Sequence, residues 1–294
     1  MNTPALGYRA SPIKRLRASR SEVLGRRAAL FAIINDMRPM TVRQVFYQAT
    51  VRDIVEKTEA GYSKVQTDLT LMRKAGELPY DWIADHTRWQ RKPRTFSSVE
   101  QALEDTARLY RKSLWDDAGA YVEIWLEKEA LSGVVLPITS MYDVPLMVAK
   151  GYASLSFLYS AAAYISSVDV PTHIYHLGDF DPSGVNAGEK IEQTLREMAP
   201  AAEIHFQRLA VTPDMIRAFN LPTRPTKTTD SRSKGFGDVS VELDAIAPND
   251  LRFIVEHVIN HHLPQDEFEV LKAAEASERV LINGLVGMLQ EQAA

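Results

Sequence analysis

The stretch THIYHLGDFDPSG, residues 172–184, joins an apolar run to two aspartates that stand one residue apart. The run THIYHL predicts a strand, and Asp179 and Asp181 follow at the point where it ends. In extended backbone, residues two apart point the same way, so both carboxylates would face one spot. Pro182 stiffens the turn beyond them, and Ser183 is placed to cap a following helix. The stretch therefore predicts an acidic site at the C-terminal edge of a parallel sheet.

The second part of the chain repeats this pattern of short apolar runs separated by helical segments. The runs are YVEIWL (121–126), VPLMVA (144–149), THIYHL (172–177) and EIHFQRLAV (203–211). Such alternation predicts an α/β fold with a parallel sheet covered by helices. Residues 222–238 have the composition of a polar loop, and the chain from about residue 247 has a helical pattern.

The first part of the chain has a different organisation. Helical patterns cover residues 22–37, 41–57 and 61–78, and an aromatic and basic segment with proline near both ends, residues 79–96, follows them. Three short helices followed by a β-hairpin are the order of a winged helix, a relative of the helix-turn-helix. The sequence therefore predicts an α+β DNA-binding domain ahead of the α/β domain.

These patterns divide the chain into five parts. They are a basic arm (1–22), a winged-helix domain that carries a candidate tyrosine (23–96), a connecting helix (97–118), a parallel-sheet domain (119–246) and a C-terminal helical segment (247–294). A chain of 294 residues is long enough for two domains that each bury a core.

Composition limits the classes of function. The sequence has no cysteine, which excludes disulfides and thiolate metal sites and is typical of a reducing cytoplasm. No apolar run is long enough to span a bilayer, and no signal-peptide core follows the basic N-terminus. We therefore expect a cytoplasmic protein with no membrane partner.

The charge is distributed unevenly along the chain. Residues 1–94 hold 18 Lys and Arg against 9 Asp and Glu, whereas residues 95–294 hold 16 against 29, for a total of −4. The basic first part favours a polyanion, double-stranded DNA, as its partner, although chance clustering on solvated faces is an alternative. The residues expected to contact phosphates are Lys64, Arg73 and Lys74 of the third helix and Arg88, Arg91, Lys92 and Arg94 of the predicted wing.

A third carboxylate follows an earlier strand in the same way. Glu127 comes directly after the run YVEIWL, so it would reach the same sheet edge as Asp179 and Asp181. Three converging carboxylates repel one another unless a cation lies among them, and hard oxygen ligands favour Mg²⁺. The alternative is that the two aspartates only cap a turn and a helix.

The helix that begins near residue 41 carries the second candidate site. Thr41 and Gln44 match a capping box, which places the helix start at Thr41. Arg43 and Tyr47 are four residues apart and share one face. A guanidinium can neutralise a phosphodiester while a tyrosine oxygen attacks it. The apolar residues expected to supply the buried face, leaving Tyr47 exposed, are Val42, Val45, Phe46 and Ala49. The alternative is a partly buried Tyr47 that only packs against a neighbouring helix.

Taken together, these motifs resemble a known family. TVRQVFY (41–47), VEIWLEKEAL (122–131), LMVAKGYASLSF (146–157) and LGDFDPSG (177–184) occur in the order found in the DNA-cleaving subunit of DNA topoisomerase VI, a type IIB topoisomerase, and its meiotic double-strand-break relatives. In that family the tyrosine belongs to a winged helix and the acidic motifs to a Toprim domain. The resemblance covers roughly residues 25–240.

The resemblance implies specific roles. Tyr47 would be the nucleophile and Arg43 a phosphate stabiliser, while Glu127, Asp179 and Asp181 would bind Mg²⁺. The family acts as a homodimer in which one protomer's tyrosine meets the other's metal site, and it leaves a 5′-phosphotyrosyl bond. Strand passage in the family needs a separate ATPase subunit, so this chain alone is not expected to relax DNA processively.

Some residues depart from the family pattern. Gly178 precedes the first aspartate, Phe180 separates the two aspartates where smaller residues are usual, and Ala153-Ser154 stand where a Pro-Asp pair is common. Two other functions therefore stay open. The acidic site could hydrolyse DNA with metal-activated water while Tyr47 is structural, or the chain could be a non-catalytic DNA-binding relative.

Overall fold

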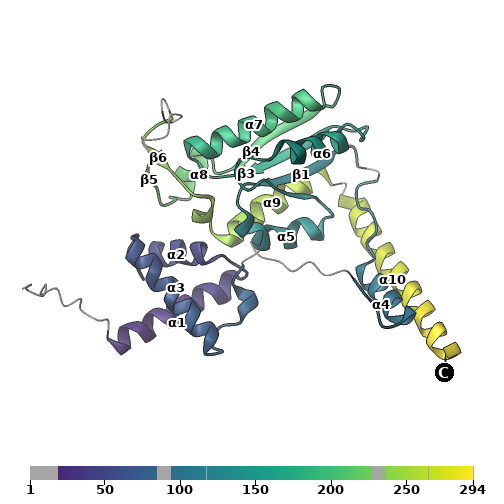
Figure 1. Cartoon of the computed structure of the whole chain (residues 1–294), viewed down its shortest axis with the longest axis horizontal. Coiled ribbons are helices and arrows are strands. Elements are labelled where there is room, and N and C mark those ends of the chain that lie inside the picture. Colours follow the sequence, from purple (N-terminus) through teal and green to yellow (C-terminus); the bar gives the residue numbers. More distant parts are fainter. Residues whose placement is uncertain are drawn as a thin grey trace, which may run out of the picture.

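The computed structural model describes residues 19–84, 94–116, 118–226, 233, 236–263 and 265–293. It contains three N-terminal helices, a part built on a parallel sheet, and two helices, α4 (Val99–Leu109) and α10 (Gln265–Ala293), that pack together and project from the rest (Figure 1). Residues 1–18 of the predicted arm and 85–93 of the predicted hairpin lie outside the described residues.

The N-terminal helices begin at side-chain caps. The helices are α1 (Arg20–Met37), α2 (Val42–Val51) and α3 (Glu59–Lys74). Thr41 forms the predicted capping box with Gln44, Ser19 forms another ahead of α1, and Thr58 caps α3. Each cap satisfies backbone N–H groups that have no partner inside the helix, so the local sequence determines where the three helices start.

Helix α2 is shorter than predicted, since it ends at Val51 and not at residue 57. Asp53 has a φ of 55°, and the N–H of Ile54 donates to the carbonyl of Ala49 over 2.9 Å. This is a Schellman-type helix end, for which glycine is the usual signal. Because aspartate occupies the left-handed position here, the sequence pattern did not mark the end.

Four parallel strands form the sheet in the order β2-β1-β3-β4, and the parallel arrangement agrees with the prediction. The strands are β1 (Tyr121–Leu126), β2 (Leu146–Val148), β3 (Thr172–Leu177) and β4 (Ile204–Ala210). Leu126 of β1 pairs with Leu177 of β3 and with Val148 of β2. The ends of three neighbouring strands are therefore level, and the loops beyond them share one edge.

Helices cover both faces of the sheet (Figure 1). Trp125 and Ile174 are buried in one cluster with α6 (Leu155–Ile165) and α7 (Pro182–Met198). Their strand neighbours Ile124 and Tyr175 belong to the other cluster, with α5 (Ser132–Met141) and α9 (Pro248–His262). Because strand residues alternate between faces, strands with two buried faces read as near-continuous apolar runs.

The segment between β4 and α9 contains several short elements. They are α8 (Pro213–Ala218), the antiparallel pair β5 (Arg224–Pro225) and β6 (Val239–Ser240), and a 3₁₀ turn (Leu243–Ala245). None of the helices in the described part of the chain has the length and apolar character needed to cross a lipid bilayer.

The N-terminal helices and the α/β part are continuous in space. Apolar residues of α1 and α2 belong to the same buried cluster as residues of β1, α5 and α9. At the junction, the Arg252 guanidinium of α9 donates to the carbonyl oxygens of Met37 (2.7 Å) and Pro39 (3.1 Å). The turn that leads into α2 is therefore held against α9.

Replacing Arg252 with alanine should weaken this junction. Hydrogen bonds from a charged group contribute about 1.5–3 kcal/mol, so we expect Arg252→Ala to lower the free energy of unfolding by about 2 kcal/mol in chemical denaturation. Arg196→Ala, which breaks an exposed pair with Glu192 on α7, should change it by less than about 0.5 kcal/mol. Equal effects of the two substitutions would contradict this role of Arg252.

Candidate active site

Glu127 and Asp179 lie side by side at the C-terminal edge of the sheet. Glu127 directly follows β1, and Asp179 follows the neighbouring strand β3 by two residues. The Asp179 N–H donates to Glu127 Oε2 over 3.0 Å. Burial and then the charge of Asp179 raise the pKa of Glu127, and burial raises the pKa of Asp179. Two buried acids in contact favour a cation between or beside them.

Asp181 has different partners. Its Oδ1 accepts the Gly184 N–H over 2.8 Å and so caps α7, and its Oδ2 lies 3.0 Å from a guanidinium nitrogen of Arg224. The prediction that Ser183 caps this helix was wrong, because Asp181 does so and Pro182 already occupies the first helical position. The charge of Asp181 still contributes to the raised pKa of Glu127.

The three predicted metal ligands are close but are not arranged as a finished metal site. Within the described ranges, no group of three or more histidine, aspartate or glutamate side chains is placed to hold a metal ion. Asp179 and Asp181 are instead paired with basic side chains, Lys128 and Arg224.

Two glycines allow Glu127 to lie against the Asp179 loop. A Cβ on Gly178 would come within 2.6 Å of Glu127 Oε2 and 2.7 Å of His176 Cε1. A Cβ on Gly184 would come within 2.5 Å of the Asp179 carbonyl oxygen and 2.9 Å of Glu127 Oε2. Gly178 is one of the departures from the pattern of the family that the sequence resembles. Its local contacts explain it, because the Glu127 carboxylate occupies the space where a Cβ would lie.

Arg208 of β4 holds the same loop. Its guanidinium donates to the carbonyl oxygens of Gly178 (2.9 Å), Asp179 and Gly184 (3.3 Å), and its Nε donates to that of Val211 (2.9 Å). One side chain thus satisfies four carbonyl groups around the loop and limits how far the acidic residues can move.

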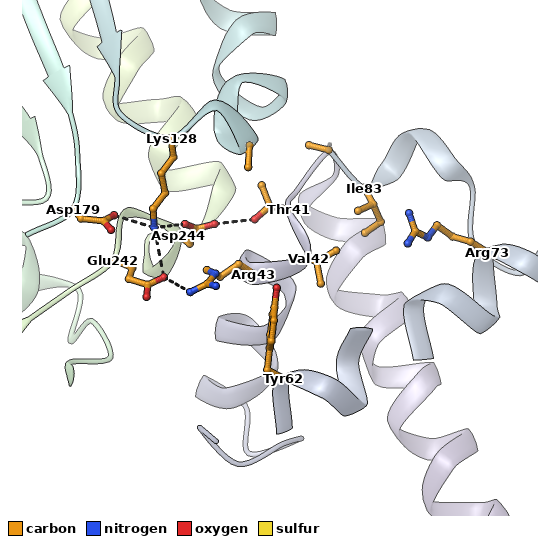
Figure 2. Close-up of a pocket in the computed structure, with 12 residues that line it drawn as sticks. Thr41, Val42, Arg43, Tyr62, Arg73, Ile83, Lys128, Asp179, Glu242 and Asp244 are labelled. Atoms are coloured by element: carbon orange, nitrogen blue, oxygen red, sulfur yellow. Dashed lines mark hydrogen bonds and ion pairs between the residues drawn. The ribbon is translucent and has the colours of Figure 1, made fainter. Parts of the chain in front are cut away.

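Lys128 is the centre of an ion-pair network (Figure 2). Its Nζ lies 3.0 Å from Asp179 Oδ1, 2.8 Å from Asp244 Oδ2 and 3.4 Å from Glu242 Oε2. Burial lowers the pKa of Lys128, but the three carboxylates outweigh burial and raise it above its ordinary value. The ammonium therefore stays charged and compensates part of the acidic site.

The segment that carries Glu242 is tied to the Asp179 loop. Phe180 and Val241 exchange backbone hydrogen bonds of 2.8 and 2.9 Å, and the Leu243 N–H donates to Asp179 Oδ1 over 2.8 Å. The centre of the Phe180 ring lies 4.9 Å from that of Phe236. Phe180, the second departure from the family pattern, thus contacts the segment that supplies two further carboxylates.

The beginning of α2 contacts the same carboxylates. The Arg43 guanidinium lies 2.7 Å from Glu242 Oε2, and the Thr41 hydroxyl donates to Asp244 Oδ1 over 2.9 Å (Figure 2). Arg43 and the acidic loops, although far apart in sequence, therefore belong to one site.

Tyr47 is buried, with 5% of its surface exposed, so the expectation of an exposed hydroxyl was wrong. Helix α2 packs against α1, α3 and the turn Leu243–Ala245. As a result, residues 44–49 of the helix, which include Tyr47, are all buried. Burial and the charge of Glu242 raise the pKa of Tyr47 to about 12, although Arg43 and Lys128 oppose this shift. In this conformation Tyr47 is a protonated phenol.

A cavity of about 510 Å³ opens between α2 and the acidic loops. Tyr62 of α3 lines it, and the Arg43 guanidinium carbon lies 5.4 Å from the centre of the Tyr62 ring. The lining residues are Thr41, Val42, Arg43, Tyr62, Arg73, Ile83, Ala84, Lys128, Ala130, Asp179, Glu242 and Asp244. The tyrosine that faces the cavity is therefore Tyr62, which the sequence pattern did not single out.

The predicted phosphate-contacting residues lie in different places. Lys64 and Lys74 are exposed on α3, and Arg73 lines the cavity. Of the predicted wing residues, Arg94 is exposed, whereas Arg88, Arg91 and Lys92 lie outside the described residues.

Three further site residues, Glu242, Asp244 and Arg224, were not predicted from the sequence. They come from the polar segment and the residues after it, which were interpreted as a loop and a domain boundary. The available signal was the spacing: Glu242 and Asp244 stand one residue apart, as Asp179 and Asp181 do.

No family model matches the sequence, and no curated protein matches it either. The site is therefore interpreted from its own residues.

Glu127 should destabilise the fold when it is ionised. Because its pKa is raised by folding, its favourable contribution is present at low pH and is lost as pH rises through the folded-state pKa. We expect Glu127→Gln to raise the melting temperature at pH 8 by about 2 °C or more in metal-free buffer, with a smaller difference at pH 5. Glu197→Gln, on the last turn of α7, should show no such pH-dependent gain; a gain of equal size there would contradict the assignment.

Proposed function

We propose that this protein cleaves DNA in a Mg²⁺-dependent reaction, with a winged-helix part that binds the duplex and a Toprim-type sheet that carries the acidic residues. The observation that carries the proposal is that Glu127 and Asp179, at the ends of adjacent parallel strands, are joined through Lys128 and Glu242 to Arg43 of α2. Metal-dependent phosphodiester cleavage can use these two kinds of group, acidic residues for a cation and a guanidinium for the phosphate.

The resemblance to the DNA-cleaving subunit of topoisomerase VI supports the same roles. Three of its four motifs fall on α2, on the end of β1 and on the loop after β3, and these three places meet at one cavity of a single chain. In the family itself the tyrosine of one protomer meets the metal site of the other. By the same resemblance, the active form would be a homodimer, and any strand passage would need a separate ATPase subunit.

The donor chemistry at the sheet edge fits Mg²⁺. Glu127, Asp179 and Asp181 offer only hard carboxylate oxygens, and burial is the main cause of the raised pKa values of Glu127 and Asp179. These three residues would hold the ion after Asp179 and Asp181 exchange part of their contact with Lys128 and Arg224. When bound, Mg²⁺ would neutralise charge on the leaving oxygen of the phosphodiester.

In the proposed reaction the Tyr47 oxygen attacks phosphorus, and the bond from phosphorus to the 3′ oxygen breaks. The phenol loses its proton and the 3′ oxygen gains one, which leaves a 5′-phosphotyrosyl bond and a free 3′ hydroxyl. Arg43 would bind the non-bridging phosphate oxygens, where charge increases in the transition state. Because Tyr47 is buried, this reaction requires α2 or the elements packed on it to move.

One observation favours a second candidate, direct hydrolysis by metal-activated water. Tyr47 has little exposed surface and a pKa of about 12, both unfavourable for a nucleophile. The hydrolytic alternative would leave no covalent intermediate. Tyr62, which faces the cavity, is a further candidate nucleophile to be tested beside Tyr47.

The test uses supercoiled plasmid and Mg²⁺, with reactions stopped in denaturant and divided into protease-treated and untreated halves. We expect cut DNA that carries protein until proteolysis. Tyr47→Phe and Asp179→Ala should each lower cleavage on the order of a thousand-fold or more. Tyr62→Phe and Tyr159→Phe, the latter at an exposed position on α6, should retain it.

Other outcomes select among the alternatives. Free ends that persist in Tyr47→Phe would assign the chemistry to water, and loss of adducts only in Tyr62→Phe would move the nucleophile to α3. Binding of the plasmid without Mg²⁺-dependent cutting by the purified protein would contradict catalysis by this chain alone.

A further inference from the structure

The Glu242 carboxylate is surrounded by basic side chains from three separate parts of the chain. Its Oε2 lies 2.7 Å from an Arg43 nitrogen and 3.4 Å from Lys128 Nζ, and its Oε1 lies 3.9 Å from Arg224 Nε. The Glu242 side chain is 11% exposed. Lys128 also pairs with Asp179 and Asp244, and Arg224 also pairs with Asp181, whereas Arg43 is paired with Glu242. Glu242 is therefore the carboxylate that holds the Arg43 guanidinium.

The neighbouring carboxylate completes the set of contacts. Asp244 accepts the Thr41 hydroxyl over 2.9 Å and pairs with Lys128 over 2.8 Å. Two anionic groups, spaced by one residue, thus engage a guanidinium, an ammonium and a hydroxyl. These donors are the side-chain types that contact consecutive phosphates of a nucleic-acid strand.

The two carboxylates also lie in the cavity through which a substrate would reach Asp179. Glu242 and Asp244 line the cavity together with Arg43 and Asp179. A DNA phosphate that reached Asp179 through this cavity would meet Arg43 and Lys128 where Glu242 now binds them. The carboxylates and the phosphate cannot both occupy those positions.

We propose that the segment Glu242–Asp244 occupies the place of DNA phosphates, and that Arg43, Lys128 and Arg224 form a phosphate-binding set from which DNA displaces Glu242. This inference rests on the proposed function, because it takes DNA as the ligand. It adds the residues that bind the phosphate and a reason for the buried state of Tyr47: the same contacts hold α2 closed.

Duplex binding tests the inference without requiring cleavage. All proteins carry Tyr47→Phe, and affinity for a short labelled duplex is measured in EDTA over a series of salt concentrations. We expect Glu242→Gln to tighten binding about three- to tenfold, because the internal competitor for Arg43 is weakened. Glu197→Gln removes the same charge from the last turn of α7 and should change binding less than about twofold.

A double-mutant cycle separates competition from a general charge effect. Arg43→Gln should weaken binding and reduce the slope of log K against log salt by about one. The gain from Glu242→Gln should then largely disappear in the Arg43→Gln background, since the two residues act through one contact. Additive effects of the two substitutions would contradict displacement of Glu242 from Arg43.

A measurement on the protein with Glu242 intact guards against variants that fold poorly. Hydrogen exchange of the peptide covering residues 239–245 should become faster when DNA binds, because Glu242 and Asp244 lose their partners. Slower or unchanged exchange would contradict the inference. If no form of the protein binds duplex DNA, both the inference and the proposed function fail. If the protein binds DNA but Glu242→Gln binds no more tightly than Glu197→Gln, the inference alone fails.

Discussion

The ammonium of Lys128 connects the two parts of the molecule. It contacts Asp179 from the loop after β3 and Glu242 and Asp244 from the segment before α9, and these last two carboxylates hold Arg43 and Thr41 at the start of α2. Charges this close, and largely removed from water, must be balanced. The ion pairs that neutralise the acidic loops therefore also hold the start of α2, together with the apolar cluster and Arg252.

Under the proposed function, this arrangement would link the access of DNA to the cleavage reaction. While Glu242 binds Arg43, Tyr47 is buried and protonated, and Asp179 is paired with Lys128. An anion that displaced Glu242 from Arg43 would weaken the attachment of α2. A cation that bound Asp179 would compete with Lys128. DNA and Mg²⁺ would thus act on the two ends of one network, and the resting state would expose no reactive tyrosine at position 47.

Much of the fold, but less of the site, could be predicted from sequence. All four strands lie within the predicted apolar runs, most clearly β1 and β3, which are buried on both faces. The start of α2 was predictable because Thr41 and Gln44 are a local signal. The contact between Glu127 and Asp179 followed from the way both residues end a strand. The burial of Tyr47 could not be predicted, because it depends on the packing of α2 against α1, α3 and the turn Leu243–Ala245. The pairs Lys128–Glu242 and Arg43–Glu242 span 114 and 199 residues, a separation that no local pattern encodes.

The most direct test of a DNA-cleaving site at the junction of α2 and the sheet is to locate the adduct. The protein is incubated with Mg²⁺ and duplex DNA, denatured, digested with nuclease and trypsin, and sequenced by mass spectrometry. Tyr47 lies in the tryptic peptide of residues 44–52 and Tyr62 in that of residues 58–64, so the two tyrosines are distinguished. We predict a nucleotide on Tyr47. A nucleotide on Tyr62, or cut DNA with no modified tyrosine, would contradict the assignment of Tyr47 as the nucleophile.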